Sequence, residues 1–153
     1  MSYDLMALDK RKRFSNKRDF LCWYDTVTEW ADDIDYNDYR HATTSLQNWF
    51  MAMKDIVPPL NGEFALSDVD LGSGEYQEAD YAIATEAIYV AFAWSDAEKA
   101  YNLAERLAKQ FDVALFDICS NRVIYPDGFI LNVDDTQEGT FTTFMNRLKK
   151  LFH

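Results

Sequence analysis

Acidic and aromatic side chains alternate between Trp23 and Tyr39, in the stretch WYDTVTEWADDIDYNDY. Tyrosine and tryptophan anchor many protein interfaces, and carboxylates around them steer and pair with lysine or arginine. The pattern therefore predicts a surface that binds a basic protein partner. The predicted contact residues in this stretch are Asp32, Asp33, Asp35, Tyr36, Asp38 and Tyr39. The competing interpretation places Tyr24 and Trp30 in the core, as their helical spacing allows, and treats the acids as a solvated helix end.

A second acidic stretch follows further along the chain. No lysine or arginine occurs from Asp55 to Glu86. Residues 60–78 show no sustained hydrophobic period and are interrupted by glycines, which predicts a long acidic loop. Long loops in compact domains are often functional. The acids predicted to face the same basic partner are Asp68, Asp70, Glu75, Glu78 and Asp80.

The stretch that starts at Asp68 resembles a calcium-binding loop over its first three residues only. A calcium loop needs glycine at its sixth position and a bidentate carboxylate at its twelfth. This chain has Ser73 and Ala79 at those positions. We therefore predict no metal site in this loop.

Residues suited to catalysis are sparse. His41 and His153 are the only histidines, which is too few for a zinc site or a Ser-His-Asp arrangement. No glycine-rich phosphate-binding motif occurs, and no base that would activate Cys119 is identifiable. Adjacent carboxylates such as Asp32 and Asp33 could act as acid and base, but solvated loop charge explains them without a pocket. The sequence predicts a non-enzymatic protein with no catalytic residue, no cofactor and no metal.

The formal net charge is −11, from 26 acidic and 15 basic residues. The bases gather in residues 10–18 and 147–150, so the chain between these two clusters is still more acidic. Such a field repels nucleic acid and speeds association with cationic partners. Solubility is the competing explanation for a surplus of acidic residues.

The composition indicates one globular domain over residues 1–153. A hydrophobic fraction of 48% and an aromatic fraction of 16% are typical of a well-packed soluble protein. No apolar run of about 18 residues exists, which predicts no membrane span, and the N-terminal basic cluster follows the apolar stretch, unlike that of a signal peptide. Cys22 and Cys119 lie among apolar neighbours, so we predict buried free thiols in a reducing cytoplasm.

Hydrophobic periodicity predicts the elements that position these residues. The predicted strands are Tyr3–Asp9, Tyr81–Thr85, Ala87–Trp94, Val113–Ile118, Arg122–Tyr125 and Phe129–Val133, and the predicted helices are Asn16–Ala31, Ser45–Val57, Asp96–Gln110 and Phe141–Leu151. Two of these strands, Tyr3–Asp9 and Ala87–Trp94, are apolar on both faces, which predicts positions inside the sheet.

The order of the elements predicts an α+β fold, with helices packed on an antiparallel or mixed sheet. It resembles the split β-α-β, ferredoxin-like plan, with an extra helix in the first crossover and a C-terminal hairpin and helix added. Ser15 and Thr44 are the predicted N-caps of the first two helices, and Ser95 with Glu98 matches a capping box.

Four segments resemble a group of small, mostly uncharacterised bacterial proteins: SYDLMALD, FLCWYDTVTEW, LQNWFMAMKDIVPPLNG and YVAFAWSDAEKAY. Small acidic α+β proteins of this kind are similar to immunity proteins, which neutralise toxins used in competition between bacteria. The resemblance implies an acidic surface that blocks a basic, nuclease-type toxin domain, because sites that bind nucleic acid are rich in lysine and arginine. It assigns no functional residue by position.

A small-ligand sensing or accessory domain is the alternative function. Such a domain would use a pocket between the helices and the sheet. The predicted lining residues are Trp49, Tyr89, Phe92 and Trp94.

Overall fold

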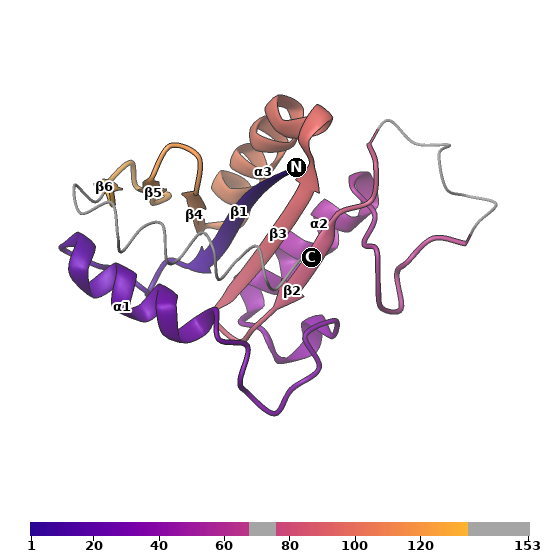
Figure 1. Cartoon of the computed structure of the whole chain (residues 1–153), viewed down its shortest axis with the longest axis horizontal. Helices are drawn as coiled ribbons and strands as arrows, with labels where there is room; N and C mark the ends of the chain where they lie inside the picture. Colours follow the sequence, from indigo (N-terminus) through magenta and orange to yellow (C-terminus); the bar gives the residue numbers. More distant parts are fainter. Residues whose placement is uncertain (68–75, 135–153) are drawn as a thin grey trace.

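The computed structural model describes residues 1–67 and 76–134. Asp68, Asp70 and Glu75, three of the predicted partner-facing acids, lie outside these residues, as does the predicted helix Phe141–Leu151. Within them the chain has an α+β architecture, in which a six-stranded antiparallel sheet carries three α-helices (Figure 1). No helix in this part of the chain is long and apolar enough to cross a membrane.

The sheet contains every strand that the sequence predicts, with ends that differ by a few residues. The strands are β1 (Ser2–Asp9), β2 (Asp80–Ile83), β3 (Ala87–Ala93), β4 (Val113–Asp117), β5 (Arg122–Ile124) and β6 (Ile130–Asn132). Their order across the sheet is β2-β3-β1-β4-β5-β6, and each neighbouring pair is antiparallel.

β1 lies inside the sheet and is paired on both edges. Residues 2–8 pair with β3 and residues 5–9 pair with β4. Because side chains alternate between the two faces of a strand, Leu5 and Ala7 enter one core while Met6 and Leu8 enter the other. All four are fully buried. The uninterrupted apolar run of β1 thus reflects burial on both faces, and the predicted internal position of this strand is confirmed.

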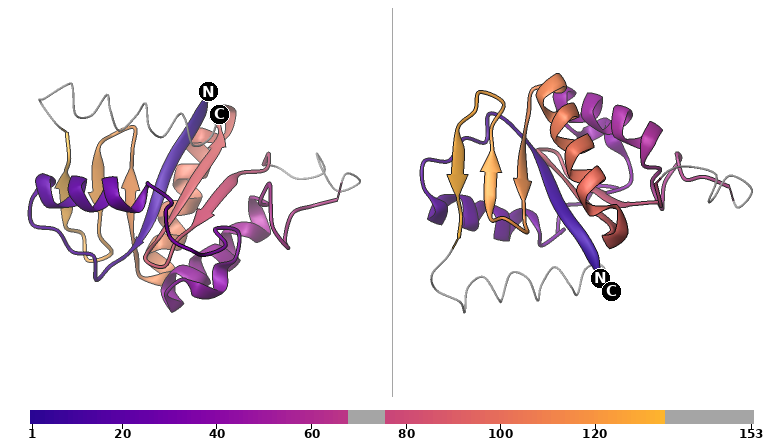
Figure 2. Two further views of the ribbon diagram at one scale, coloured as in Figure 1. Left: turned by 60° about the horizontal axis from the view of Figure 1, so that its bottom comes forward. Right: turned by 90° about the horizontal axis from the view of Figure 1, so that it is seen from above.

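The helices cover both faces of the sheet (Figure 2). α2 (Thr44–Ile56) and α3 (Ala97–Phe111) pack on one face, and α1 (Lys17–Val27) packs on the other, which we call the α1 face. Two short 3-10 turns, η1 (Tyr39–His41) and η2 (Trp94–Asp96), precede α2 and α3. The chain therefore crosses from the α1 face to the opposite face between α1 and α2.

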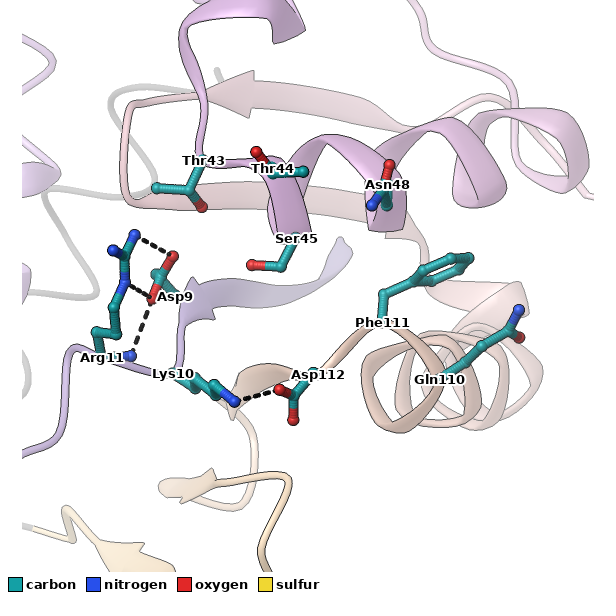
Figure 3. Close-up of a pocket in the computed structure, with 10 residues that line it drawn as sticks. All are labelled: Asp9, Lys10, Arg11, Thr43, Thr44, Ser45, Asn48, Gln110, Phe111 and Asp112. Carbon is teal, nitrogen blue, oxygen red and sulfur yellow. Dashed lines mark hydrogen bonds and ion pairs between the residues drawn. The ribbon is translucent and has the colours of Figure 1, made fainter.

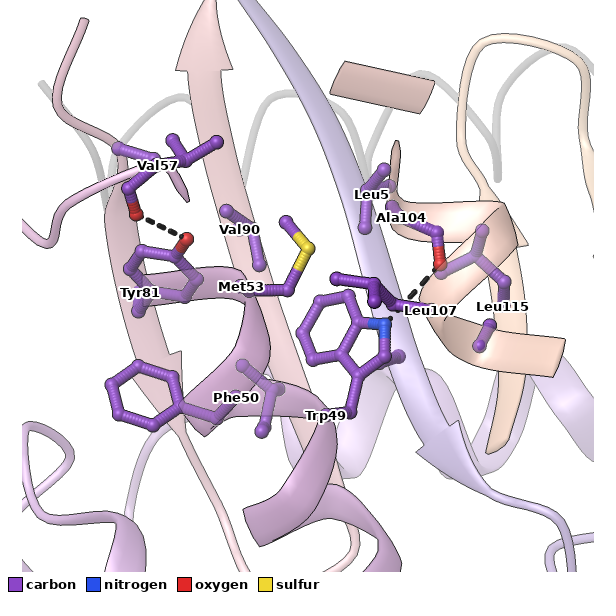
Figure 4. Packing of buried hydrophobic residues seen from close by; sticks show 14 of the residues in the cluster. Leu5, Trp49, Phe50, Met53, Val57, Tyr81, Val90, Ala104, Leu107 and Leu115 are labelled. Carbon is purple, nitrogen blue, oxygen red and sulfur yellow. Dashed lines mark hydrogen bonds between the residues drawn. The ribbon is translucent and has the colours of Figure 1, made fainter. Parts of the chain in front are cut away.

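Two large core side chains form hydrogen bonds between elements. Trp49 of α2 is fully buried, and its indole N–H donates to the carbonyl oxygen of Ala104 in α3, 3.2 Å away (Figure 4). The hydroxyl of Tyr81 donates to the carbonyl oxygen of Val57 over 2.8 Å. These bonds remove the penalty of burying an unpaired donor, and they fix α2 against both α3 and β2.

The first two helices begin with capping residues other than those predicted. Asn16, rather than Ser15, caps α1, because its side-chain oxygen accepts a hydrogen bond from the amide of Asp19 at 2.9 Å. Thr43, rather than Thr44, is the N-cap residue of α2, and its side chain forms no capping hydrogen bond.

The capping box predicted from Ser95 and Glu98 does not form. Residues 94–96 make the turn η2, which moves the N-cap of α3 to Asp96. The Asp96 carboxylate accepts a hydrogen bond from the amide of Gln77 at 3.0 Å and pairs with Lys99 at 3.3 Å. It ties the segment before β2 to the start of α3, which leaves the cap without a side-chain acceptor of its own.

α1 ends at Val27, short of the predicted end at Ala31. The Thr28 hydroxyl donates back to the carbonyl oxygen of Tyr24 over 2.7 Å. Trp30 then adopts a left-handed backbone conformation with φ of 51°, which breaks the helix and is rare for a bulky residue. The helical spacing of the sequence continues past Val27, but the chain has already turned into a loop.

Both cysteines are exposed free thiols, which contradicts the predicted burial. α1 turns Phe20 and Tyr24 towards the sheet, and Cys22 lies between them in sequence on the opposite side of the helix. Cys119 follows β4, in the turn before β5. Apolar neighbours in the sequence did not determine burial at either position.

Trp49→Phe should destabilise the protein by about 2–4 kcal/mol, because it removes a buried hydrogen bond and leaves a cavity between α2 and α3. Urea unfolding followed by circular dichroism measures the change. The matched control is Trp94→Phe: Trp94 is 52% exposed, so this variant should change stability by less than about 0.5 kcal/mol. Equal effects of the two substitutions would contradict the assigned packing.

Candidate functional site

Aromatic contacts anchor the loop between α1 and η1, which comprises residues 28–38. The ring of Trp30 packs edge-on against the rings of Tyr36 and Tyr89, with centroids 5.3 and 6.2 Å apart. The amide of Asp32 donates to the Tyr36 hydroxyl at 2.9 Å. The amide of Ile83 donates to the carbonyl oxygen of Tyr36 at 2.8 Å, which joins the loop to the edge of β2. The loop is therefore held against the sheet.

Three predicted contact residues, Asp32, Asp33 and Asp35, project from this loop. All three are exposed. None of them forms an ion pair with any residue of the described segments. The Asp35 carboxylate also accepts a hydrogen bond from the amide of Asn37, 2.9 Å from its Oδ1 atom. Within this part of the chain, these three carboxylates therefore carry uncompensated negative charge.

Asp38 and Tyr39, also predicted as contact residues, hold the end of the loop in place. Asp38 accepts a hydrogen bond from the amide of Arg40, whose guanidinium lies 3.0 Å from Asp38 and 2.8 Å from Glu63. The backbone hydrogen bond and the guanidinium hold the pKa of Asp38 below its usual value. The Tyr39 ring stacks 6.0 Å from Phe50, against the core. Neither residue is as available to a partner as the three acids before it.

Glu78 and Asp80 lie on either side of Ala79, at the start of β2. The amide of Ala79 donates to the carbonyl oxygen of Pro58 at 3.0 Å, so the segment after α2 covers this part of the β2 edge. Glu78 is half-exposed. Asp80 is half-buried, and burial raises the pKa of its carboxyl group. Asp80 belongs to the sheet, whereas the three exposed acids belong to the loop.

A cavity of about 550 Å³ opens where the end of β1, the start of α2 and the end of α3 meet (Figure 3). Its lining residues are Asp9, Lys10, Arg11, Thr43, Thr44, Ser45, Asn48, Gln110, Phe111 and Asp112. No sequence pattern predicts this cavity, because its walls come from three segments that are distant in the sequence. The one local signal is the polar pair Thr44 and Ser45, which the sequence pattern predicts to be the N-cap and first residue of a helix.

The charged side chains of the cavity are paired with one another. Arg11 donates to Asp9 from its amide and Nε at 2.9 Å and from Nη2 at 3.1 Å. The hydrogen bond from the Arg11 side chain is the main reason why the pKa of Asp9 falls to about 2. Lys10 pairs with Asp112. The charges of the two acids and the two bases cancel. The groups that the cavity presents to a ligand are therefore mainly hydroxyls and amides.

The pocket predicted from Trp49, Tyr89, Phe92 and Trp94 does not form. Trp49 and Phe92 are buried between the sheet and α2 with α3, whereas Tyr89 is buried on the α1 face. Trp94 is exposed in η2. Because side chains alternate along a strand, β3 sends Tyr89 and Phe92 to opposite faces of the sheet.

Neither similarity to known proteins nor a metal-binding group assigns a function to the described part of the chain. Protein-family models, curated proteins and solved structures contain no match to the chain. Within residues 1–67 and 76–134, no group of His, Cys, Asp or Glu side chains is arranged to hold a metal ion. His41 is engaged in the fold, since its Nε2 lies 2.7 Å from the carbonyl oxygen of Ile83.

Asp9→Asn should flatten the acid part of the stability profile. The folded pKa of Asp9, about 2, lies below the unfolded value of about 4. The carboxylate therefore stabilises the fold above about pH 4, and this contribution is lost as the pH falls towards 2. We expect the variant to lose about 1 kcal/mol above pH 4, a modest value because solvent screens the Arg11 partner.

Urea unfolding from about pH 2 to pH 6 measures this difference. The control is Asp112→Asn, which breaks the exposed pair with Lys10 and should change stability less. Parallel pH profiles for the wild-type protein and Asp9→Asn would show that the Asp9–Arg11 contact contributes nothing.

Proposed function

We propose that the protein is a non-enzymatic binding protein whose loop 28–38 receives a basic protein domain. In this proposal the partner is a nuclease-type bacterial toxin domain, which the chain neutralises as an immunity protein does. The observation that carries the proposal is the exposure of three carboxylates, those of Asp32, Asp33 and Asp35. They are exposed and form no ion pair within the described residues, yet the backbone that bears them is fixed by Trp30 and Tyr36.

A fixed acidic loop is suited to such a partner for two reasons. Anchoring by packed side chains lowers the ordering cost that a mobile loop would pay on binding. Exposed carboxylates also attract the lysine and arginine side chains that would otherwise contact phosphate. Asp38 and Tyr39 then serve by holding the loop. The acidic pattern of the sequence supports further members of the same surface: Asp68, Asp70, Glu75 and Glu78.

We also propose that the protein acts in the cytoplasm and that its fold is ferredoxin-like. Two free cysteines are compatible with a reducing cytoplasm. β3 lies between β1 and β2, and β1 lies between β3 and β4, with all these pairs antiparallel. This arrangement supports a split β-α-β, ferredoxin-like unit formed by β1 to β4, to which β5 and β6 are added.

Replacing Asp32, Asp33 and Asp35 together with lysine should slow association with the partner at least about tenfold at low ionic strength. The same replacement should flatten the salt dependence of the association rate. Folding stability should change by less than about 1 kcal/mol, because exposed charges contribute little to it. The measurement uses a basic protein captured from the native lysate, its association rate at low and high ionic strength, and its nuclease activity with increasing amounts of the chain.

The matched control replaces Asp55, Glu98 and Asp127 with lysine, which changes the net charge equally from exposed positions outside the loop. This control should retain most of the wild-type association rate and salt dependence. If both triple variants associate equally fast, or if the captured partner has an activity that the chain does not inhibit, the proposed role of the loop is wrong.

The cavity between β1, α2 and α3 favours a second candidate function, the sensing of a small ligand. About 550 Å³ is the volume of a typical small-molecule site. A small polar metabolite that hydrogen-bonds to Thr44, Ser45 and Asn48 would fit its lining. Native mass spectrometry of the purified protein tests this candidate, since a retained metabolite would favour ligand sensing over toxin neutralisation.

A further inference from the structure

Part of the α1 face has no cover among the described helices. Asp4 of β1 and Asp80 of β2 both pair in register with Ala91 of β3, so the three side chains form one row across the face. The next row, towards the start of β1, holds Ser2 and Ala93. Figure 2 shows α1 crossing β6, β5 and β4 without reaching β2. These two rows form a shallow floor of small side chains with a carboxylate at either side.

The two carboxylates of this floor lack a basic partner in the described part of the chain. Asp4 accepts hydrogen bonds from the hydroxyls of Tyr89 at 2.6 Å and Ser2 at 2.7 Å. Asp80 is half-buried, and burial raises the pKa of its carboxyl group. A carboxylate that loses water without gaining a cation is costly, so this floor is suited to an apolar surface edged with positive charge.

We propose that the chain's own C-terminal segment, residues 135–153, docks on this floor. Its sequence has apolar residues at helical spacing, with bases close beside them: Phe141, Phe144, Met145, Leu148 and Phe152, with Arg147, Lys149 and Lys150. The apolar residues match the floor of small side chains, and the bases match the two carboxylates. Charge complementarity and the hydrophobic period therefore both favour residues 135–153 as the segment that docks here.

The exit of the described chain leads to this face. Val133 is fully buried in the core of the α1 face, and the carbonyl oxygen of Asp134 accepts a hydrogen bond from Lys17 at the start of α1. β6 and β3 are four strand spacings apart, roughly 19 Å. Residues 135–140 span up to about 20 Å when extended. The apolar segment after them therefore reaches the floor without displacing α1.

This inference goes beyond the proposed function and changes the role of one residue. Asp80, predicted from the sequence to face a partner, serves contact within the chain. The exposed acids of the loop 28–38 keep their role, so a failure of partner binding and a failure of this docking are separate results.

A charge exchange in the full-length chain tests the docking. Reversing the three bases, Arg147→Glu with Lys149→Glu and Lys150→Glu, should destabilise the otherwise unchanged protein. The same reversal should cost less when combined with Asp80→Lys, with a coupling of roughly two- to fivefold in the unfolding equilibrium constant. The control combines the same reversal of the three bases with Glu98→Lys instead of Asp80→Lys. Glu98 lies on α3, at the other face of the sheet, where no coupling with the three bases is expected. Equal coupling at both positions, or none at Asp80, overturns the proposal.

A second measurement locates the contact directly. A synthetic peptide of residues 135–153, titrated into a labelled chain that ends at Asp134, should give saturable chemical-shift changes at Ala82, Ala91 and Ala93. Changes confined to Ile124 and Ile130, on the opposite face, would overturn the proposal. So would a full-length dimer that becomes monomeric on truncation, because the segment would then dock on a second copy. If the shortened chain does not fold, the charge exchange in the full-length protein decides.

Discussion

The burial of β1 on both faces and its pairing on both edges is the constraint on which the rest of the structure depends. Leu5 and Ala7 face α2 and α3, while Met6 and Leu8 face the side of α1. Burying a leucine or methionine side chain contributes about 1.5–3 kcal/mol, and the buried side chains of β1 are divided between the two cores. A change in β1 would therefore disturb both layers of helices, whereas β6 is joined to the sheet by β5 alone.

Both candidate sites take their position from what β1 holds together. The strand ends at Asp9, whose carboxylate fixes Arg11 at the mouth of the cavity. On the α1 face, β1 pairs with β3, and Tyr89 of β3 provides the surface against which Trp30 packs. The acidic loop and the cavity lie at different places on the molecule. The geometry of both nevertheless depends on the central strand β1. Contacts with the sheet therefore hold the proposed loop surface in place, although the loop itself has no regular structure.

The positions of the strands and helices along the sequence could be predicted because they depend on the period of the hydrophobic residues. An apolar run such as β1 or β3 indicates burial on both faces whatever its neighbours are. The helix ends could not be predicted as well, because Asn16 and Ser15 are both good caps and only backbone geometry chooses between them. The end of α1 depends on Trp30, whose ring packs on Tyr89, a residue far away in the sequence.

The candidate site was predictable only in part for the same reason. The high density of acids predicts Asp32, Asp33 and Asp35 as contact residues. It does not show that Asp38 forms an ion pair with Arg40 or that Tyr39 stacks on Phe50. The exposure of Cys22 depends on the side of α1 that meets the sheet. The cavity joins Asp9, Thr44 and Phe111 through tertiary packing, which a single sequence does not encode in any one window.

Native-state hydrogen exchange tests the central role of β1 most directly. We predict that the slowest amides of β1 exchange only through global unfolding, together with those of β3 and β4, while β6 and the loop 28–38 open locally at lower free energy. Exchange of the β1 amides through a partial opening that leaves β4, β5 and β6 protected would contradict it, because the sheet would then be organised around another strand.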